Sequence, residues 1–114
     1  MIDRTVLHGG AQRLPVRLAN EVEPPQRVSR YVIAPGDRCS RHVHAGKAET
    51  WLIVAGSGVA HLDDRRIDVV EGDMLVTPPG TSHALDNTGT VPLVFVNIVS
   101  PTGGPITTTE LETP

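Results

Sequence analysis

The chain is poor in aromatic residues, in cysteine and in net charge. Its 114 residues include one tryptophan, one tyrosine and one phenylalanine, so few side chains could stack on nucleic-acid bases. A formal net charge of -3 gives no basic footprint for nucleic acid. The single cysteine, Cys39, excludes an intrachain disulfide framework and fits a reducing compartment. We therefore expect no nucleic-acid partner.

Long apolar segments are also lacking. The first residues, 1–4, include no apolar signal segment, and no run approaches the length that spans a bilayer. These two absences predict a cytoplasmic protein with no membrane partner. A chain of 114 residues is long enough for one domain with a modest core.

Glycine and proline, by contrast, are frequent. Eleven glycines and ten prolines suit many short strands that are joined by tight turns. No stretch has convincing helical periodicity. The expected strands are residues 6–7, 14–18, 27–34, 40–43, 50–55, 59–62, 67–70, 74–77, 81–85 and 92–99. This pattern predicts an all-β sandwich or barrel.

Metal-ligating side chains gather in one stretch, residues 36–56. Alternate side chains of a strand share a face, so His42 and His44 are predicted to point the same way. Glu49 follows after a short glycine-containing loop and would add an oxygen ligand from the adjacent strand. His83, in a second stretch rich in glycine and proline, is the candidate for a fourth ligand. Three imidazoles and one carboxylate suit a divalent transition metal rather than Ca²⁺, which prefers oxygen ligands.

Both stretches resemble the two sequence motifs of the cupin superfamily. The first motif, G-x5-H-x-H-x4-E-x6-G, is matched at Gly36, His42, His44, Glu49 and Gly56. The second motif, G-x5-P-x-G-x2-H-x3-N, is matched at Gly72, Pro78, Gly80, His83 and Asn87. The resemblance covers residues 36–87 directly and residues 27–99 by strand pattern.

The resemblance implies a small single-domain cupin, which is a double-stranded β-helix or jelly-roll barrel. Its one metal ion per chain would be held by His42, His44, Glu49 and His83. It implies an N-terminal arm over residues 1–26, a barrel over residues 27–99 and a C-terminal tail over residues 100–114. Cupins of this size are commonly homodimers, often with exchanged N-terminal strands, and residues 1–20 are available for that role. The tail is expected to be irregular or to extend along a partner.

The reaction is left open by the resemblance, because cupins include dioxygenases, isomerases, decarboxylases, lyases, cyclases and non-enzymatic binders. Open positions on the metal could bind substrate or dioxygen. The leading hypothesis is an iron(II) dioxygenase that acts on a small organic metabolite, with Glu49 also serving as a base. Manganese, nickel, cobalt and zinc are the other candidate metals. The alternatives are a redox-silent lyase, isomerase or cyclase, and a non-enzymatic cupin that binds a metabolite.

Three further residues are candidates for the substrate pocket. Ser40 shares strand parity with the histidine pair. Trp51 shares the parity of Glu49 and could line the cavity or fill the core. Asn97 interrupts an apolar run, so its amide, if buried, must contact substrate or make a structural hydrogen bond. The scarcity of aromatic and basic residues favours a small metabolite over a nucleotide.

Strand parity also gives expectations for the neighbours of these residues. Arg38 is predicted to face the same way as the histidine pair, and Cys39 the opposite way, as a packed small hydrophobe. Arg30 and Tyr31 lie on opposite faces of one strand, so at most one of them should reach the pocket. Asn87 is expected to fix a turn.

Overall fold

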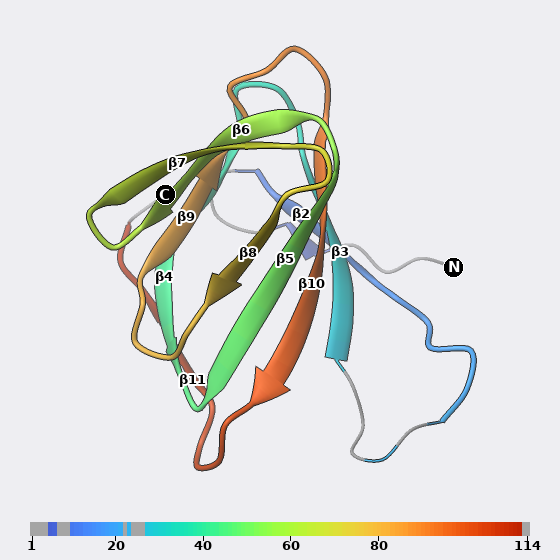
Figure 1. The fold of residues 1–114 in the computed structure, drawn as a ribbon, viewed down its shortest axis with the longest axis vertical. Helices are drawn as coiled ribbons and strands as arrows, with labels where there is room; N and C mark the ends of the chain where they lie inside the picture. The colour runs from blue at the N-terminus through green and yellow to red at the C-terminus, as the bar shows by residue number, and fades with distance from the viewer. Residues whose placement is uncertain (1–4, 7–9, 22, 24–26, 113–114) are drawn as a thin grey trace.

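The computed structural model describes residues 5–6, 10–21, 23 and 27–112. Within these ranges the chain forms eleven strands and no helix (Figure 1). The strands are β1 (Thr5–Val6), β2 (Gln12–Pro15), β3 (Arg27–Ile33), β4 (Arg38–Ala45), β5 (Lys47–Ala55), β6 (Ser57–Leu62), β7 (Arg65–Val70), β8 (Met74–Thr77), β9 (His83–Asp86), β10 (Leu93–Pro101) and β11 (Thr107–Glu110). No helix in the described ranges therefore has the length and hydropathy needed to cross a membrane.

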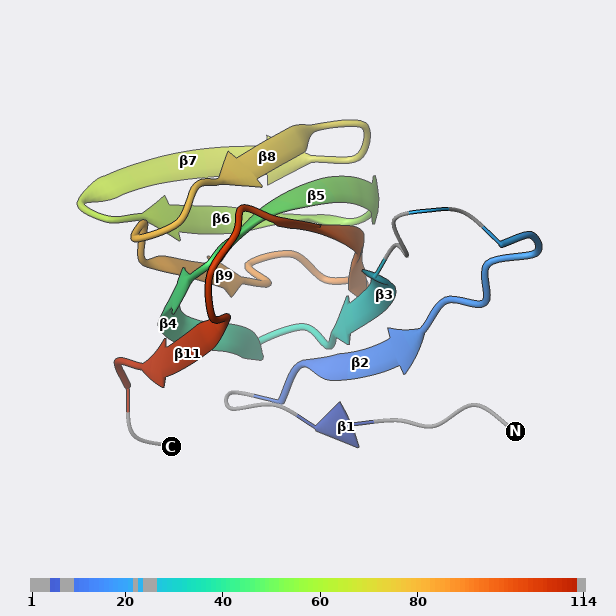
Figure 2. The same ribbon diagram turned by 90° about the horizontal axis from the view of Figure 1, so that it is seen from below.

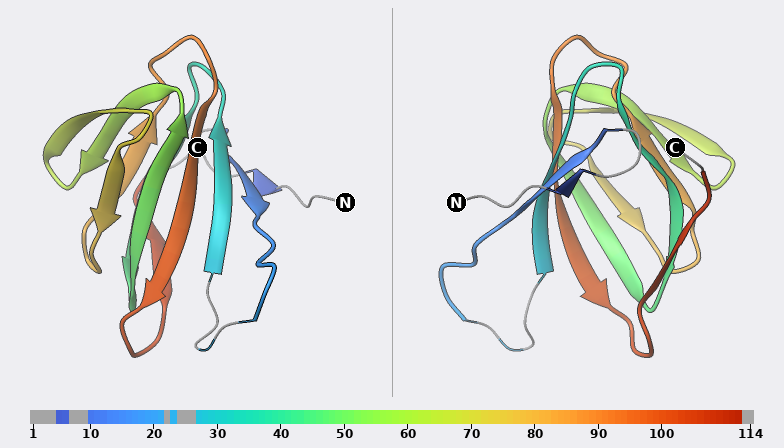
Figure 3. Two further views of the ribbon diagram at one scale, coloured as in Figure 1. Left: turned by 45° about the vertical axis from the view of Figure 1, so that its right-hand side comes forward. Right: turned by 180° about the vertical axis from the view of Figure 1, so that it is seen from behind.

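Two antiparallel sheets face one another and enclose the core (Figure 2). The first sheet has six strands in the order β1-β2-β3-β10-β5-β8, and the second has five in the order β11-β4-β9-β6-β7. β10 lies between β3 and β5, as Figure 3 shows. The all-β jelly-roll prediction is confirmed.

Alternation along β5 shows how the sequence selects its inner face. Glu49, Trp51 and Ile53 are buried, whereas Leu52 between them is 40% exposed. β5 ends at Ala55, and the next residue, Gly56, has a φ of +83°. An added Cβ at Gly56 would lie 2.5 Å from the carbonyl oxygen of Pro92. Only glycine suits this corner, where the chain passes from the first sheet to the second.

The C-terminal segment differs from its prediction. Instead of being irregular, Thr107–Glu110 forms β11, which pairs with β4 of the same chain. Three consecutive threonines suit a strand because β-branched side chains pack well on a pleated surface. The Leu111 amide donates to the Arg41 carbonyl at 2.9 Å and extends the attachment of this segment.

The N-terminal arm also packs on the barrel of its own chain in the described residues, because β2 pairs with β3. β2 begins and ends earlier than the strand predicted at residues 14–18. Leu7 of the first predicted strand lies outside the described residues. Strand exchange between subunits and the three segment boundaries stay predictions.

Asn87 fixes a turn, as predicted. Its side-chain amide donates to the carbonyl oxygens of Ile33 and Val91, both at 2.8 Å, and its Oδ1 accepts from the Gly89 amide at 2.9 Å. The side chain is buried, so it replaces water for three backbone groups at one end of the barrel.

We expect Asn87→Ala to lower the free energy of unfolding by about 2–4 kcal/mol, because buried backbone groups lose their partners. Urea unfolding followed by fluorescence measures this change. The control is Thr88→Ala at the exposed neighbour, which should change stability by less than about 0.5 kcal/mol. Equal stabilities for the two variants would contradict this role of Asn87.

Candidate metal centre

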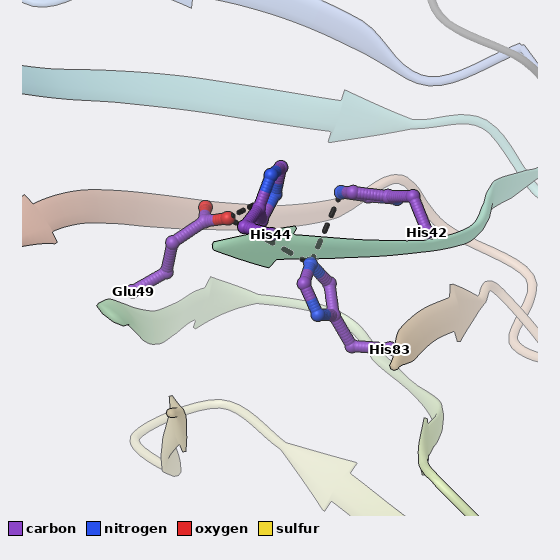
Figure 4. Close-up of side chains that lie close together, drawn as sticks. All are labelled: His42, His44, Glu49 and His83. Carbon is purple, nitrogen blue, oxygen red and sulfur yellow. Dashed lines mark hydrogen bonds and ion pairs between the residues drawn. The ribbon is translucent and has the colours of Figure 1, made fainter. Parts of the chain in front are cut away.

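Four side chains point toward one another inside the barrel (Figure 4). His42 and His44 come from β4, Glu49 from β5 and His83 from β9, and their ligand atoms all lie within 4.8 Å of one another. His42 pairs directly with His83 across β4 and β9. The predicted candidate ligands are therefore brought together by the fold.

The turn that brings Glu49 beside the histidines depends on Gly46. This residue has a φ of +81°, and an added Cβ would lie 2.3 Å from the carbonyl oxygen of Pro105. A side chain at this position would strain the backbone and collide with the segment that leads to β11. The tight turn between β4 and β5 thereby places Glu49 within reach of His44.

The hydrogen bonds of His42 and His83 define their tautomers. The Nδ1 atom of His42 lies 2.8 Å from the Ser40 carbonyl oxygen, and that of His83 lies 3.0 Å from the Thr81 carbonyl oxygen. Since a carbonyl only accepts, both Nδ1 atoms carry the proton and both Nε2 atoms present a lone pair. These Nε2 atoms lie 3.0 Å apart. A cation between them would satisfy both lone pairs.

Glu49 presents one oxygen to the same point. Its Oε2 accepts hydrogen bonds from the side chains of Asn97 and Trp51. Its Oε1 is buried without a hydrogen bond of acceptable geometry in the described residues, although it lies 2.6 Å from His44 Nε2. A proton or a metal ion is needed between two such atoms. The second nitrogen of His44, Nδ1, is held 2.8 Å from Thr108 Oγ1.

The protonation states suit metal binding. Burial lowers the pKa of His83 to about 4, helped by the charge of His42, and burial also lowers the pKa of His42. For Glu49, burial raises the pKa, but the close approach and charge of His44, with the charges of Lys47 and His83, outweigh burial and lower the pKa to about 2. Neutral imidazoles and an ionised carboxylate are the forms that ligate a divalent ion. Three imidazole nitrogens and one carboxylate oxygen could thus hold a transition metal.

A cavity of about 340 Å³ is lined by three of the four donors, His42, His44 and Glu49. Its wall contains every aromatic residue of the chain, Tyr31, Trp51 and Phe95. The rings of Tyr31 and Phe95 stack at 4.8 Å between centroids, and that of Trp51 lies 4.7 Å from Phe95. Trp51 in turn contacts the ring of His83 edge-on at 5.2 Å. The aromatic wall therefore runs from the cavity to the candidate metal centre.

Charged residues from both ends of the chain reach the same cavity. Arg13 of β2 and Lys47 of β5 contribute cations, and Glu110 of β11 contributes a carboxylate besides Glu49. Sequence reasoning did not single out Arg13 or Glu110, because each lies in a segment with weak local signals. Only the pairing of β2 with β3 and of β11 with β4 places them here.

The predicted pocket residues divide into two groups. Ser40 and Trp51 line the cavity, as does Tyr31, whereas Arg30 on the other face of β3 is exposed. Asn97 is buried but is not among the lining residues, because its amide group binds Glu49 Oε2. Asn97 therefore orients Glu49, which is the structural hydrogen bond weighed for it above.

The parity prediction for Arg38 and Cys39 is wrong. The β4–β9 register shifts between Cys39 and His42, so strict alternation from the histidines does not extend to the start of β4. Cys39 is buried and lines the cavity, whereas Arg38 faces away and pairs with Asp86 at 3.2 Å and Glu112 at 3.0 Å. Cys39 still packs in the core, and burial raises the pKa of its thiol to about 12.

Comparison with known proteins places the chain in a family. Residues 29–99 match the family model described as the cupin domain, which spans more than half of the chain. The chain belongs to the cupin family. All four candidate metal ligands lie inside the matched residues.

Relatives of known name match part of the chain. The oxalate-binding protein of Thermotoga maritima is 32% identical over 71 residues, which are 62% of this chain and 59% of that protein. A mannose-1-phosphate guanylyltransferase of Klebsiella pneumoniae is 32% identical over 77 residues, which are 68% of this chain and 16% of that enzyme. The chain thus covers less than two thirds of the length of either relative.

Solved structures match the chain over a larger share of its length. A Thermotoga maritima protein described as a predicted oxalate decarboxylase has a TM-score of 0.77 and 25% identity, over 88% of this chain and 91% of that one. A Klebsiella pneumoniae protein with a double-stranded β-helix domain has a TM-score of 0.73 and 26% identity, over 90% and 87% of the two chains. The double-stranded β-helix implied by the sequence motifs is confirmed.

We expect Thr108→Val to weaken divalent-metal affinity by about 10-fold to 100-fold, because His44 loses the partner that orients its ring. Competition with a chromophoric chelator measures the affinity. The control is Thr109→Val, which makes the same chemical change one position along β11, on its opposite face. Equal affinities for the two variants would contradict the role of Thr108.

Proposed function

We propose that this cupin is a metalloprotein that binds a small organic metabolite, and that with iron(II) it acts as a dioxygenase. One observation carries the proposal: four donors converge at one point, and three of them also line a cavity of about 340 Å³. The donors are His42, His44, Glu49 and His83. Because four donors would fill only four of the six positions of an octahedral ion, two positions would be left for ligands from the cavity.

When bound, iron(II) supplies electrons for chemistry with dioxygen, whereas zinc, nickel, manganese or cobalt supplies Lewis acidity. The protein positions the metabolite and excludes water from it. Ser40 and Trp51 contact the metabolite, and the aromatic wall restricts access of water to the reacting end. Asn97 and Trp51 hold Glu49 Oε2, so Oε1 is directed toward the metal.

Two lining residues that are not metal donors, Tyr31 and Cys39, are poor proton-transfer groups. Burial raises the pKa of both Tyr31 and Cys39 to about 12, so neither thiolate nor phenolate forms near neutral pH. Glu49, with a pKa of about 2, is a weak base, and we assign it to holding the metal. The base role implied for Glu49 by the family stays a prediction. Lyase, isomerase or cyclase chemistry would therefore have to use Lys47 or Glu110, the other lining side chains that could transfer a proton.

The second candidate is a non-enzymatic cupin that binds a metabolite. Its support is the similarity to the oxalate-binding protein of Thermotoga maritima. It differs from the first candidate in predicting that the bound metabolite is released unchanged.

The dioxygenase proposal predicts that the iron(II)-loaded protein consumes dioxygen together with a small metal-chelating metabolite. An oxygen electrode and mass spectrometry of the products measure the two in parallel. The zinc-loaded protein is the control and should bind the metabolite without oxygen uptake. Turnover of metabolite without oxygen uptake would contradict the dioxygenase, and tight binding without turnover would support the second candidate.

A homodimer, implied by the family, is also proposed. The outer face of β5 and β8 carries four exposed apolar side chains: Leu52, Val54, Met74 and Val76. Pairing this face with its copy would remove them from water. We expect sedimentation equilibrium to give a dimer for the wild type and a monomer for Met74→Glu. A wild-type monomer would contradict the proposal, as would a dimer that is unaffected by the substitution.

A further inference from the structure

Arg13 is the exposed cation at the margin of the cavity. Its partner in the β2–β3 register is Tyr31, whose ring forms part of the cavity wall. The charge of Arg13 reaches the Tyr31 hydroxyl, where it lowers the pKa against the larger effect of burial. The side chain of Arg13 makes no ion pair or hydrogen bond within the described part of the chain. Its guanidinium donors are therefore available to a ligand.

Lys47, the other cation of the cavity, is placed differently. Its side chain is 15% exposed, and its Nζ lies 4.0 Å from Glu49 Oε1. Its charge is directed toward a carboxylate of the candidate metal centre. Of the two cations that line the cavity, Arg13 is thus the one that makes no ion pair within the described residues.

The charges of the lining favour an anionic ligand. The positive charges of Arg13 and Lys47 equal in number the negative charges of Glu49 and Glu110. The lining would therefore not neutralise the charge of a bound divalent ion. Buried positive charge of this kind attracts an anion. A guanidinium binds a carboxylate through two parallel hydrogen bonds, a geometry that a lysine ammonium does not offer.

We propose that Arg13 determines substrate specificity by binding a carboxylate at the end of the ligand that lies away from the metal. The ligand class is a small organic acid, with oxygen atoms at one end that chelate the metal and a carboxylate at the other. The inference rests on the proposed metal-dependent function and narrows its substrate. It requires no change in the metal donors, because Arg13 lies on β2 and the donors lie on β4, β5 and β9.

The test uses the cobalt(II)-loaded full chain and two probes with the same chelating end. Succinic monohydroxamate ends in a carboxylate, and its terminal amide replaces that group by a neutral one of similar shape. Homologues of both probes with a shorter and a longer methylene chain test other distances between the chelating end and the terminal group. Cobalt absorption reports chelation, and isothermal titration calorimetry gives the affinities.

Arg13→Gln should weaken binding of the best carboxylate probe by about tenfold and leave the amide probe unchanged. The control is Arg30→Gln on the neighbouring strand, where the side chain is exposed on the other face. This variant should bind both probes like the wild type. Cobalt stoichiometry should be the same in all three proteins.

Several results would overturn the inference. One is equal affinity of wild type and Arg13→Gln for the carboxylate probes, and another is an equal loss for the amide probe. A similar loss of affinity for the carboxylate probe in Arg30→Gln would mean that the net charge of the protein, and not a contact with Arg13, causes the effect. Failure of the wild type to take up cobalt would instead contradict the proposed function itself, so the two failures are distinguishable.

Discussion

The candidate site depends on four donor atoms that face one another without enough protons to bond. The Nε2 atoms of His42 and His83 lie 3.0 Å apart with both lone pairs directed inward. Burying polar atoms without partners costs about 1–3 kcal/mol for each atom. The barrel holds this arrangement because another atom of each donor side chain makes a hydrogen bond outside the centre. A divalent ion would convert the unfavourable contacts into bonds.

The supports behind the donors come from distant parts of the chain. Carbonyl groups two residues before His42 and His83 orient those rings, so their geometry is local. His44 depends instead on Thr108 of β11, and Glu49 depends on Asn97 of β10. The site is thus complete only when β10 and β11 are paired in the barrel. Neighbouring groups of this kind commonly tune ligand orientation and metal affinity.

Local sequence patterns predicted the donors but only part of their surroundings. Alternation on β4 and the turn at Gly46 are properties of a few consecutive residues, so His42, His44 and Glu49 could be placed from sequence. The register shift after Cys39 could not, because it arises from pairing with β9 and has no local signal. Arg13 and Thr108 were missed for a similar reason: they reach the cavity through strand pairs that join the ends of the chain to its middle.

The candidate metal donors and some of the residues that line the cavity come from different parts of the chain. The cupin match spans residues 29–99 and contains every candidate metal donor. Arg13, Thr108 and Glu110 lie outside it and still line the cavity. The matched residues therefore contain the candidate metal donors, and the flanking strands add three residues to the lining of the cavity.

The central claim is that these four side chains hold one metal ion, and elemental analysis of the protein purified without an affinity tag tests it most directly. The comparison is a double variant, His42→Ala with His83→Ala, whose fold is checked by circular dichroism. The account predicts about one equivalent of a divalent transition metal in the wild type, after reconstitution if necessary, and its loss in the variant. Equal metal content in the two proteins, or none in either after reconstitution, would contradict it.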